Sequence, residues 1–524
     1  MPRKQACTVQ EVLLLKRALN GLVISPLDKN SGKLITCCPV LYKECLDATF
    51  DTSTNTYYQD VLPTRFTPSL AQRTNDGILD HMLHTDNNPQ TLGGEMDVIR
   101  HWQLYYKRMG WDKIAPFNSK GKLGDMYTLF KDKNCTDPTV RTKKFKKARP
   151  ISPYIKHPMR KLLRTSAKAW MFLIRQLKGS HFILHATQDF KQHIHNTNVK
   201  FMQQKEGSTH THSWDISGCY TNIPKDIAIK AMQDVLDMVK ADPTINDSEQ
   251  RHINMCSPAI TAKTSKEAVN LPKSGKGPIY WGYGGPNRIT ITFKQLMDIT
   301  RFSLNNAIFK LGQRIVKQIH GIPMGDPLSP AICIATCAQA EQSWFDNLSK
   351  ETQQKLSFCR YMDDIYLGVK NMTAQDEQKM IQDFESQCYP SCLTLEKTQA
   401  DTFLETEVSV TNNQIIISHY NKNKEHLQKT GLQRYYKQQN FLSYTPRRTK
   451  SGTLIGLWTR MQSNSSNDTV LNHAVSDKLH ELQHTLSYPT HFISQTLLYM
   501  HSKTKKQIWQ QMAKNMVANM TTSI

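Results

Sequence analysis

Short apolar runs separated by turn-forming residues mark the middle of this chain. Cys359–Tyr361 and Ile365–Val369 flank a Met-Asp-Asp sequence, which predicts a β-hairpin whose turn carries two aspartates. Thr211–Ser217 predicts a strand that runs into a turn, followed by a helix that begins near Pro224. The apolar run Ala331–Ala338 predicts a buried helix. These elements carry or adjoin three chemically distinctive stretches of sequence.

The hairpin aspartates, Asp363 and Asp364, are the first of these stretches. Two adjacent carboxylates repel one another and resist desolvation, so a solvated turn is their ordinary setting. A divalent cation with phosphate co-ligands is the commonest reason to hold them in a buried hairpin. Asp215, at the end of the upstream strand, supplies the partner. Asp215 and Asp363 suit a pair of metal ions that activate a 3′-hydroxyl and steady a leaving pyrophosphate, with Asp364 in support.

Tyr220 follows Asp215 by five positions and would lie under an incoming sugar. An aromatic ring there excludes a 2′-hydroxyl by bulk, so the sequence favours deoxynucleotides. The alternative interpretation is an aromatic side chain of the core beside a strand end.

A loop rich in Gly and Pro, residues 318–330, opens the predicted buried helix. Its glycines allow close approach of a base pair or a phosphate, and the helix start offers free backbone N–H groups. We expect Gln318, Gly321, Met324 and Gly325 to position the nascent base pair and its nucleotide.

With these three motifs in order, the chain resembles the palm of a reverse transcriptase. Gln318-x2-Gly321 and Asn222-Ile223-Pro224 are more similar to Penelope-like retroelements, whose polymerases are related to telomerase. The resemblance implies an α+β, right-hand polymerase fold with fingers, palm and helical thumb. It also implies RNA-directed DNA synthesis on a primer 3′-OH.

The same resemblance implies ligands and partners. The expected cofactor is Mg²⁺, with Mn²⁺ as a substitute, and the expected partners are dNTPs, an RNA template and a DNA primer or RNA–DNA hybrid. The expected metal ligands are Asp215, its neighbour Ile216, Asp363 and Asp364. Lys131 and Arg149 match fingers positions that handle the triphosphate, and Lys397 follows the hairpin as a candidate proton donor to pyrophosphate.

The resemblance also suggests boundaries. We expect an N-terminal extension at 1–125, fingers at 126–205, palm at 206–420 and thumb at 421–524. A polar insertion at about 240–290 is either a telomerase-like insertion near the primer–template duplex or a mobile surface loop. The thumb leaves too few residues for the GIY-YIG endonuclease that many Penelope-like elements carry, so we expect an endonuclease-lacking relative.

The charge of the chain agrees with a nucleic-acid partner. Lys and Arg number 67 against 44 Asp and Glu, which gives a net charge of +23 and a pI near 9.4. The alternative is a solvated basic face or a nuclear-import signal. A second basic set in the expected thumb is interleaved with aromatics that either track a duplex or form the thumb's own core. The expected nucleic-acid contacts are Lys143, Lys144, Lys146, Lys147, Arg434, Arg447 and Arg448.

The remaining features concern compartment and rival functions. Twelve cysteines show no zinc-ligand spacing, and no secretory signal or membrane-length apolar run occurs. We expect an intracellular protein, nuclear if it serves a eukaryotic retroelement, and the oligomeric state stays open. Two other functions remain: an RNA-dependent RNA polymerase, against which Tyr220 argues, and a non-catalytic nucleic-acid-binding scaffold, in which intact aspartates are unnecessary.

Overall fold

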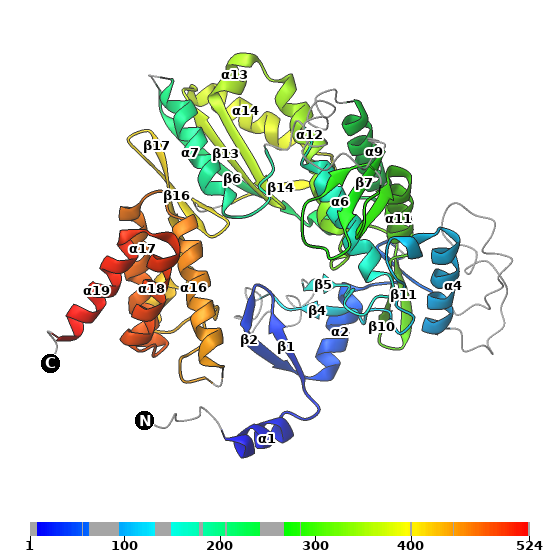
Figure 1. Ribbon diagram of the computed structural model, residues 1–524, viewed down its shortest axis with the longest axis horizontal. Coiled ribbons are helices and arrows are strands. Elements are labelled where there is room, and N and C mark those ends of the chain that lie inside the picture. Colours follow the sequence, from blue (N-terminus) through cyan, green and yellow to red (C-terminus); the bar gives the residue numbers. More distant parts are fainter. Residues whose placement is uncertain are drawn as a thin grey trace.

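The computed structural model describes residues 8–54, 56–61, 94–131, 148–177, 182–204, 207–241, 267–282, 284–398, 401–443 and 445–521. In the ribbon view the C-terminal helices lie on the left, the middle of the chain at the top and right, and the N-terminal hairpin at the bottom (Figure 1). None of the described helices combines the length and the apolar character needed to cross a bilayer.

A four-stranded antiparallel sheet forms the middle of the molecule, in the order β12-β13-β6-β14. Its alternating apolar positions pack on both faces, because successive side chains of a strand point to opposite sides. Trp214, Phe358 and Ile365 join the large core on one face, and Cys359 and Tyr366 join a smaller cluster on the other. The strands are β6 (Thr209–Ser217), β12 (Leu356–Tyr361), β13 (Asp364–Lys370) and β14 (Thr394–Lys397).

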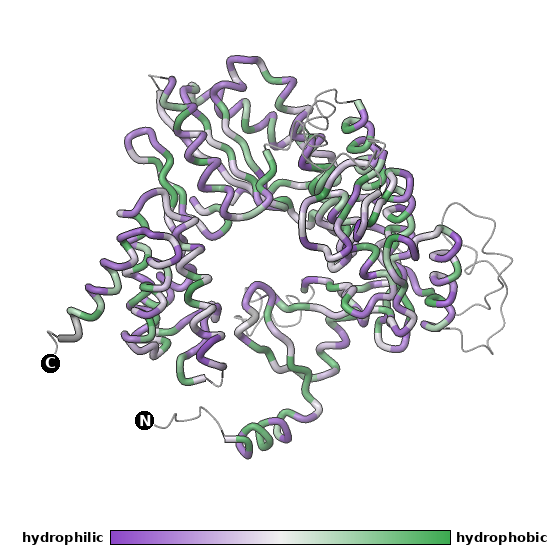
Figure 2. The backbone as a smooth tube through the Cα atoms, viewed as in Figure 1, coloured by the Kyte–Doolittle hydropathy of each residue, from purple (hydrophilic) through white to green (hydrophobic). Residues whose placement is uncertain are grey.

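Helices cover the first face of this sheet, and hydrophobic and hydrophilic residues alternate along their backbone (Figure 2). The predicted buried helix is α12, in which Ile332, Cys333 and Ala335 are fully buried. The predicted helix after Pro224 begins at Lys225, so both predictions are confirmed. The helices around this core are α6 (Arg160–Ile174), α8 (Cys219–Asn222), α9 (Lys225–Ala241), α11 (Phe293–Asn305), α12 (Ser329–Asn347), α13 (Lys350–Lys355) and α14 (Ala374–Gln387).

The second face is covered by helix α7 (Asp189–Met202) and a three-stranded sheet, β15-β16-β17. Phe190, Ile194 and Phe201 of α7 pack against Phe403 and Ile417 of that sheet. The strands are β15 (Thr402–Phe403), β16 (Thr406–Thr411) and β17 (Gln414–His419). Asp215, Asp363 and Asp364, at one end of the central sheet, are half-buried.

The N-terminal part consists of hairpins and helices beside the central core. Its elements are α1 (Val9–Ala18), β1 (Val23–Leu27), β2 (Asn30–Cys37), α2 (Pro39–Thr49), β3 (Tyr58–Asp60), α4 (Gly94–Arg108) and η2 (Trp111–Lys113). Strand β3 pairs with β11 (Arg314–Gln318), which pairs with β10 (Ile308–Leu311). Strand β4 (Tyr127–Leu129) pairs with β5 (Arg149–Ile151).

The expected insertion contains a folded sheet. Strands β7 (Ala268–Pro272), β8 (Tyr280–Trp281) and β9 (Arg288–Thr292) pair in the order β8-β7-β9. Val269, Leu271 and Ile291 belong to the large core. Residues 267–282 and 284–290 of the insertion therefore belong to a sheet whose apolar side chains join the core. Residues 242–266 lie outside the described part, and the role of the insertion stays a prediction.

The C-terminal helices enclose a core of their own, built on Trp458, Ile493 and Trp509. The elements are α15 (Lys424–Thr430), α16 (Arg447–Ser463), α17 (Asp468–His480), the π-helical turn η6 (Glu481–Thr485), α18 (Thr490–Thr504) and α19 (Gln507–Thr521). This unit meets the N-terminal hairpin through Asn30, whose side-chain amide donates to the Arg434 carbonyl at 2.9 Å and accepts from the Tyr436 N–H at 3.1 Å.

Candidate active site

The three predicted aspartates lie at one end of the central sheet. Asp364 is the direct cross-strand partner of Asp215, and the N–H of Ile216 donates to the main-chain carbonyl of Asp363 at 2.8 Å. The predicted hairpin is confirmed, but its turn carries only one of the two aspartates: the turn consists of Met362, at φ 57, and Asp363, whereas Asp364 is the first residue of strand β13. Residues far apart in the chain are therefore brought together by register.

The electrostatics of this cluster are those of crowded carboxylates. Partial burial raises the pKa of Asp215, and the negative charge of Asp363 adds to the effect. Burial likewise raises the pKa of Asp364 to about 7, with contributions from Asp363 and Asp215. Within the described residues, cations act on these groups only through longer-range charge: Lys29 and Arg149 on Asp215, and Lys29 and Lys422 on Asp364.

Such a donor set fits a divalent metal ion. Hard cations prefer carboxylate and carbonyl oxygens, which Asp215, Asp363, Asp364 and the main chain of Ile216 can provide. A bound cation would offset the repulsion that raises these pKa values. Glu396, which no sequence pattern singled out, lies opposite Asp215 on β14 and adds a fourth carboxylate to this end of the sheet.

A buried arginine stabilises the turn that carries Asp363. Arg360 is fully buried; its Nη1 donates to the Met362 carbonyl at 2.8 Å, and its Nε and Nη2 donate to the carboxylate of Glu341 on α12. The Tyr389 hydroxyl donates to the same carboxylate at 2.7 Å. The ion pair thus ties the turn to the buried helix, and the sequence pattern alone did not reveal this role.

The Gly/Pro loop packs directly against the segment that carries Tyr220. The Ile322 N–H donates to the Tyr220 carbonyl at 2.6 Å, and a Cβ on Gly321, at φ 75, would lie 2.5 Å from the Thr221 carbonyl oxygen. Tyr220 is half-buried beside the aspartates, and burial raises its pKa above the ordinary value. Only glycine fits this contact at position 321.

The same loop contacts the β4–β5 hairpin. The Ser152 N–H donates to the Met324 carbonyl at 3.0 Å, and a Cβ on Gly325, at φ 131, would lie 2.2 Å from the Ser152 carbonyl oxygen. The side chain of Gln318, in contrast, is buried and donates to the loop's own His320 carbonyl at 3.0 Å. Gln318 therefore shapes the loop, and Met324 and Gly325 lie at its accessible edge.

Arg149 and Lys131 meet at the N-terminal hairpin. Arg149 pairs with Leu129 on β4 and forms an ion pair with Asp28 at 2.9 Å. Lys131 and Asp28 pair through their main chains in an isolated parallel β-bridge. Sequence reasoning matched Asp28 and Lys29 only to the N-terminal part of the family and missed what they do at the site. Asp28 holds Arg149, and the charge of Lys29 acts on Asp215 and Asp364.

Lys397 is not brought to the aspartates. It lies opposite Trp214, one position from the Asp215–Glu396 pair, so the alternation of a strand directs it to the other face. Its charge acts on His212 instead. The expectation that it lies near pyrophosphate is corrected by this register.

The basic residues expected to contact nucleic acid are placed only in part. Lys143, Lys144, Lys146 and Lys147 lie outside the described residues. Arg447 and Arg448 are exposed at the start of α16, and the Arg447 guanidinium lies over the rings of Phe441 and Phe492. Phe441 packs against the C-terminal core, as expected of an aromatic that belongs to the thumb's own core. Tyr436 is 42% exposed, which leaves its ring accessible to a duplex.

A family model described as reverse transcriptase (RNA-dependent DNA polymerase) matches residues 287–444. The match includes the Gly/Pro loop and the aspartate hairpin. This chain carries a reverse transcriptase domain. Its fold is the α+β right hand of polymerases, and its activity is that of an RNA-directed DNA polymerase. Reverse transcriptase domains act on nucleic acids with the help of divalent metal ions, which agrees with the carboxylate cluster described above.

Distant likenesses to solved structures accompany this match, whereas no curated protein matches the sequence. Apo telomerase from Candida tropicalis aligns over 96% of this chain and 73% of its own, at 11% identity and a TM-score of 0.46. Telomerase from Candida albicans, in complex with a fragment of telomeric RNA, aligns over 96% and 70%, at 10% identity and a TM-score of 0.49. Likenesses at these scores support no further inference.

The buried ion pair can be tested by comparing single and double substitutions. Glu341→Gln leaves Arg360 buried without its counter-charge, so we expect a loss of about 3–5 kcal/mol in the free energy of unfolding, measured by urea denaturation. Glu341→Leu combined with Arg360→Met removes both charges and should recover most of this stability.

The double variant should still extend primers more slowly than the wild type, by about tenfold in kcat, because the Met362 carbonyl has lost its donor. A stable double variant with wild-type kcat would show that Arg360 does not position the turn.

Asp326, which follows Gly325, allows a test by pH. Its carboxylate is buried, accepts from Ser303 Oγ at 2.5 Å and from the Leu328 N–H at 2.9 Å, and burial raises its pKa to about 6. Between pH 4 and 6 the unfolded chain loses this proton while the folded chain keeps it, so the group's contribution to stability falls as pH rises.

The stability of Asp326→Asn relative to wild type should therefore rise by about 2 kcal/mol between pH 4 and pH 7. Urea denaturation across this range measures the difference, with the exposed Asp112→Asn as the matched control. A difference that stays constant with pH would contradict the buried, protonated state.

Proposed function

We propose that Asp215, Asp363 and Asp364, with the main chain of Ile216, hold Mg²⁺ and catalyse addition of dNTPs to a primer 3′-OH on an RNA template. The observation that carries the proposal is the register of β6 and β13, which makes Asp215 and Asp364 direct partners and ties Asp363 to Ile216. Bound divalent ions supply the charge that activates the 3′-hydroxyl and stabilises the leaving pyrophosphate.

We assign the incoming nucleotide to residues around the aspartates. Arg149 and Lys131 bind the triphosphate, and the ion pair of Arg149 with Asp28 holds the guanidinium in place until phosphates compete for it. Gly321, Met324 and Gly325 border the nascent base pair, with Gln318 shaping their loop from within. Tyr220 lies under the sugar and excludes a 2′-hydroxyl by bulk.

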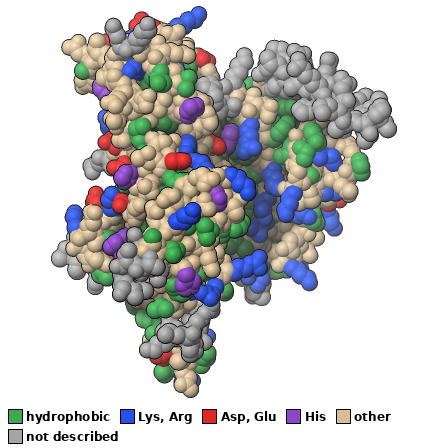
Figure 3. Space-filling view, turned by 60° about the vertical axis from the view of Figure 1, so that its left-hand side comes forward, with side chains coloured by type: hydrophobic (Ala, Val, Ile, Leu, Met, Phe, Trp, Pro, Cys, Tyr) green, Lys and Arg blue, Asp and Glu red, His purple; other side chains and the backbone are tan. Residues whose placement is uncertain are grey.

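The thumb residues Arg434, Arg447 and Arg448 are proposed to follow the phosphate backbone of the primer–template duplex. The exposure of Arg447 and Arg448 at the start of α16 supports this role. A space-filling view shows Lys and Arg side chains gathered in a deep hollow of the molecule (Figure 3). The extension, fingers, palm and thumb keep the boundaries expected above.

The identity of the element is a finer proposal. The Gln318-x2-Gly321 spacing and the Asn222-Ile223-Pro224 turn support a Penelope-like, telomerase-related reverse transcriptase that acts in the nucleus. Lys397 is not part of the proposed site, because its register directs it away from Asp215.

Catalysis by the aspartates is tested by primer extension. Asp363→Asn should lower incorporation of dNTPs on an RNA template by about a thousandfold or more, because metal ions stabilise the transition state by several kcal/mol. Asp112→Asn, a change of the same kind at an exposed carboxylate, should leave the rate unchanged. Extension that survives Asp363→Asn in both Mg²⁺ and Mn²⁺ would remove the assignment, and absence of extension by the wild type would favour the scaffold.

The sugar gate is tested by nucleotide choice. Tyr220→Ala should raise the efficiency of ribonucleotide incorporation relative to deoxynucleotide incorporation by about tenfold or more, because the ring no longer occupies the space of the 2′-hydroxyl. Competition between the two nucleotides on one RNA template measures the ratio, and Tyr220→Phe should keep the wild-type choice. A wild type that prefers ribonucleotides would contradict the gate and favour an RNA polymerase.

A further inference from the structure

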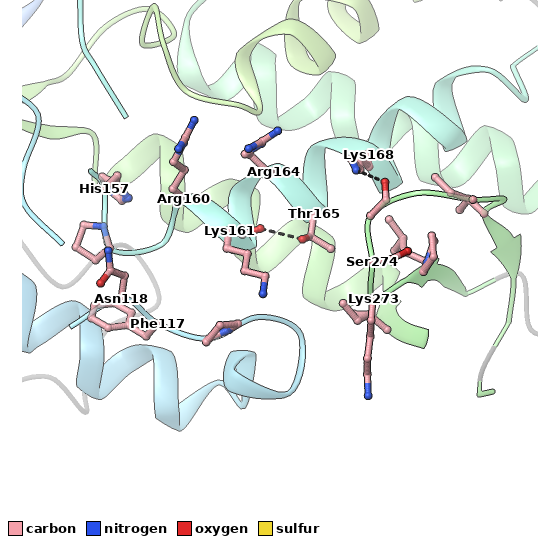
Figure 4. A pocket seen from close by; sticks show the side chains of 18 of the residues that line it. Phe117, Asn118, His157, Arg160, Lys161, Arg164, Thr165, Lys168, Lys273 and Ser274 are labelled. Atoms are coloured by element: carbon pink, nitrogen blue, oxygen red, sulfur yellow. Dashed lines mark hydrogen bonds between the residues drawn. The ribbon is translucent and has the colours of Figure 1, made fainter. Parts of the chain in front are cut away.

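A groove outside the aspartate cluster runs along helix α6. Its walls come from the N-terminal half of α6, the segment 116–118 and the loop 272–277 that follows β7 (Figure 4). The cavity between them measures about 650 Å³. A second cavity of about 490 Å³ shares Lys168, Gly277 and Ile279 with the first and reaches Arg175, so the two form one trench. Since α6 has 15 residues, the trench extends over roughly 20 Å.

The trench is positively charged along its whole length. The described side chains that line it include no Asp or Glu, and its cations are Arg160, Lys161, Arg164, Lys168, Arg175 and Lys273. All six residues are exposed. Lys168 donates to the Gly275 carbonyl at 2.7 Å and thereby joins the two walls. A groove with one sign of charge concentrates anionic ligands.

The placement of two of these cations works against the stability of the helix. Arg160 and Lys161 occupy the first turn of α6, which has no acidic residue and no side-chain cap. The positive end of the helix dipole repels cations and attracts anions at this place. The stability of the helix therefore does not explain these two charges, whereas binding of an anionic partner does.

The trench also presents apolar and hydrogen-bonding groups. Ile155 is 72% exposed at its edge and Phe117 is half-buried in its wall, so both offer apolar surface to a base. Asn118 is exposed and offers a side-chain amide to a sugar hydroxyl. This combination of cations with apolar surface is typical of single-strand binding, whereas a duplex shelters its bases.

The trench adjoins the proposed active site. Residues 152–158 connect β5, which carries Arg149, to the start of α6, and three residues of this connection line the trench: Ile155, His157 and Pro158. The first residue of the connection, Ser152, bonds the Met324 carbonyl in the loop assigned to the nascent base pair. A strand that leaves this loop along the connection reaches Arg160.

We propose that this trench binds the single-stranded RNA template on its way to the active site. The phosphates lie along the cations of α6, with Lys273 on the opposite wall, and the bases face Ile155 and Phe117. The identity of the strand as template rests on the proposed function. The binding of single-stranded RNA does not, because it needs neither metal ions nor catalysis.

The charge is tested by equilibrium binding of a fluorescent 12-nucleotide oligo(U) to the full chain, with EDTA present and across a series of KCl concentrations. The triple variant Arg160→Gln, Lys161→Gln, Arg164→Gln should bind about tenfold or more weakly at low salt. The slope of log K against log salt should fall in magnitude by about 2, since each lost phosphate contact contributes about 0.7 for a single strand. The matched control, Lys350→Gln, Lys379→Gln, Lys514→Gln, removes three exposed charges elsewhere and should keep the wild-type slope.

Two further arms separate binding from structure and RNA from DNA. The melting temperature of the triple variant should equal or exceed that of wild type, because the charges oppose the helix dipole. The wild type should bind oligo(U) more tightly than oligo(dT) of the same length.

Three results would overturn the proposal that the groove binds single-stranded RNA: a wild-type salt slope in the triple variant, an equal loss of affinity in the control variant, or a lowered melting temperature of the triple variant. Equal affinity for the two oligonucleotides would overturn the assignment to RNA. If the groove variant binds like wild type while primer extension is intact, only this inference fails; binding as predicted without extension by the wild type would sink the proposed function alone.

Discussion

The repulsion among three carboxylates at one end of a half-buried sheet is the constraint on which the rest of the site depends. Holding Asp215 and Asp364 close to Asp363 disfavours their charged forms, and the raised pKa values of Asp215 and Asp364 express this cost. The fold holds them together through the register of β6 with β13 and through Arg360, which anchors the turn to Glu341. A buried ion pair contributes little net stability, so its value lies in fixing the turn.

Cations from distant parts of the chain act on this centre. Lys29 and Arg149 come from the N-terminal hairpin and β5, and Lys422 from the segment before α15, so three distant segments moderate the same negative charge. The contacts of Asn30 with residues 434 and 436 join the hairpin to the C-terminal helices. The proposed trench along α6 relies on the same attraction between opposite charges, here between its cations and the phosphates of a nucleic-acid strand.

The sequence predicted the local elements of the site because their signals are local. Alternation and turn residues specified the hairpin around Met362, the helix after Pro224 and the buried helix after Pro330. It also predicted that Asp215 belongs with the hairpin, through a resemblance that the match of residues 287–444 to a reverse transcriptase supports. Whether these aspartates act as proposed stays a prediction.

The misses were matters of register and long-range packing. Lys397 was expected near pyrophosphate. It lies one position along β14 from Glu396, however, and its side chain is therefore directed to the opposite face of the sheet. The ion pair of Arg360 with Glu341, the approach of Asp28 and Lys29, and the folded sheet within the insertion depend on contacts between distant segments, which no local pattern encodes. The Lys143–Lys147 cluster lies outside the described residues.

The central claim is that Asp215 and the hairpin aspartates form one metal site. Titration of Mn²⁺ into the full chain with a dNTP present, followed by electron paramagnetic resonance of the free ion, measures this most directly. We predict that Asp215→Asn and Asp363→Asn each weaken Mn²⁺ binding by about tenfold or more, whereas Asp237→Asn, at an exposed position on α9, does not. Wild-type Mn²⁺ affinity in Asp215→Asn would contradict the account.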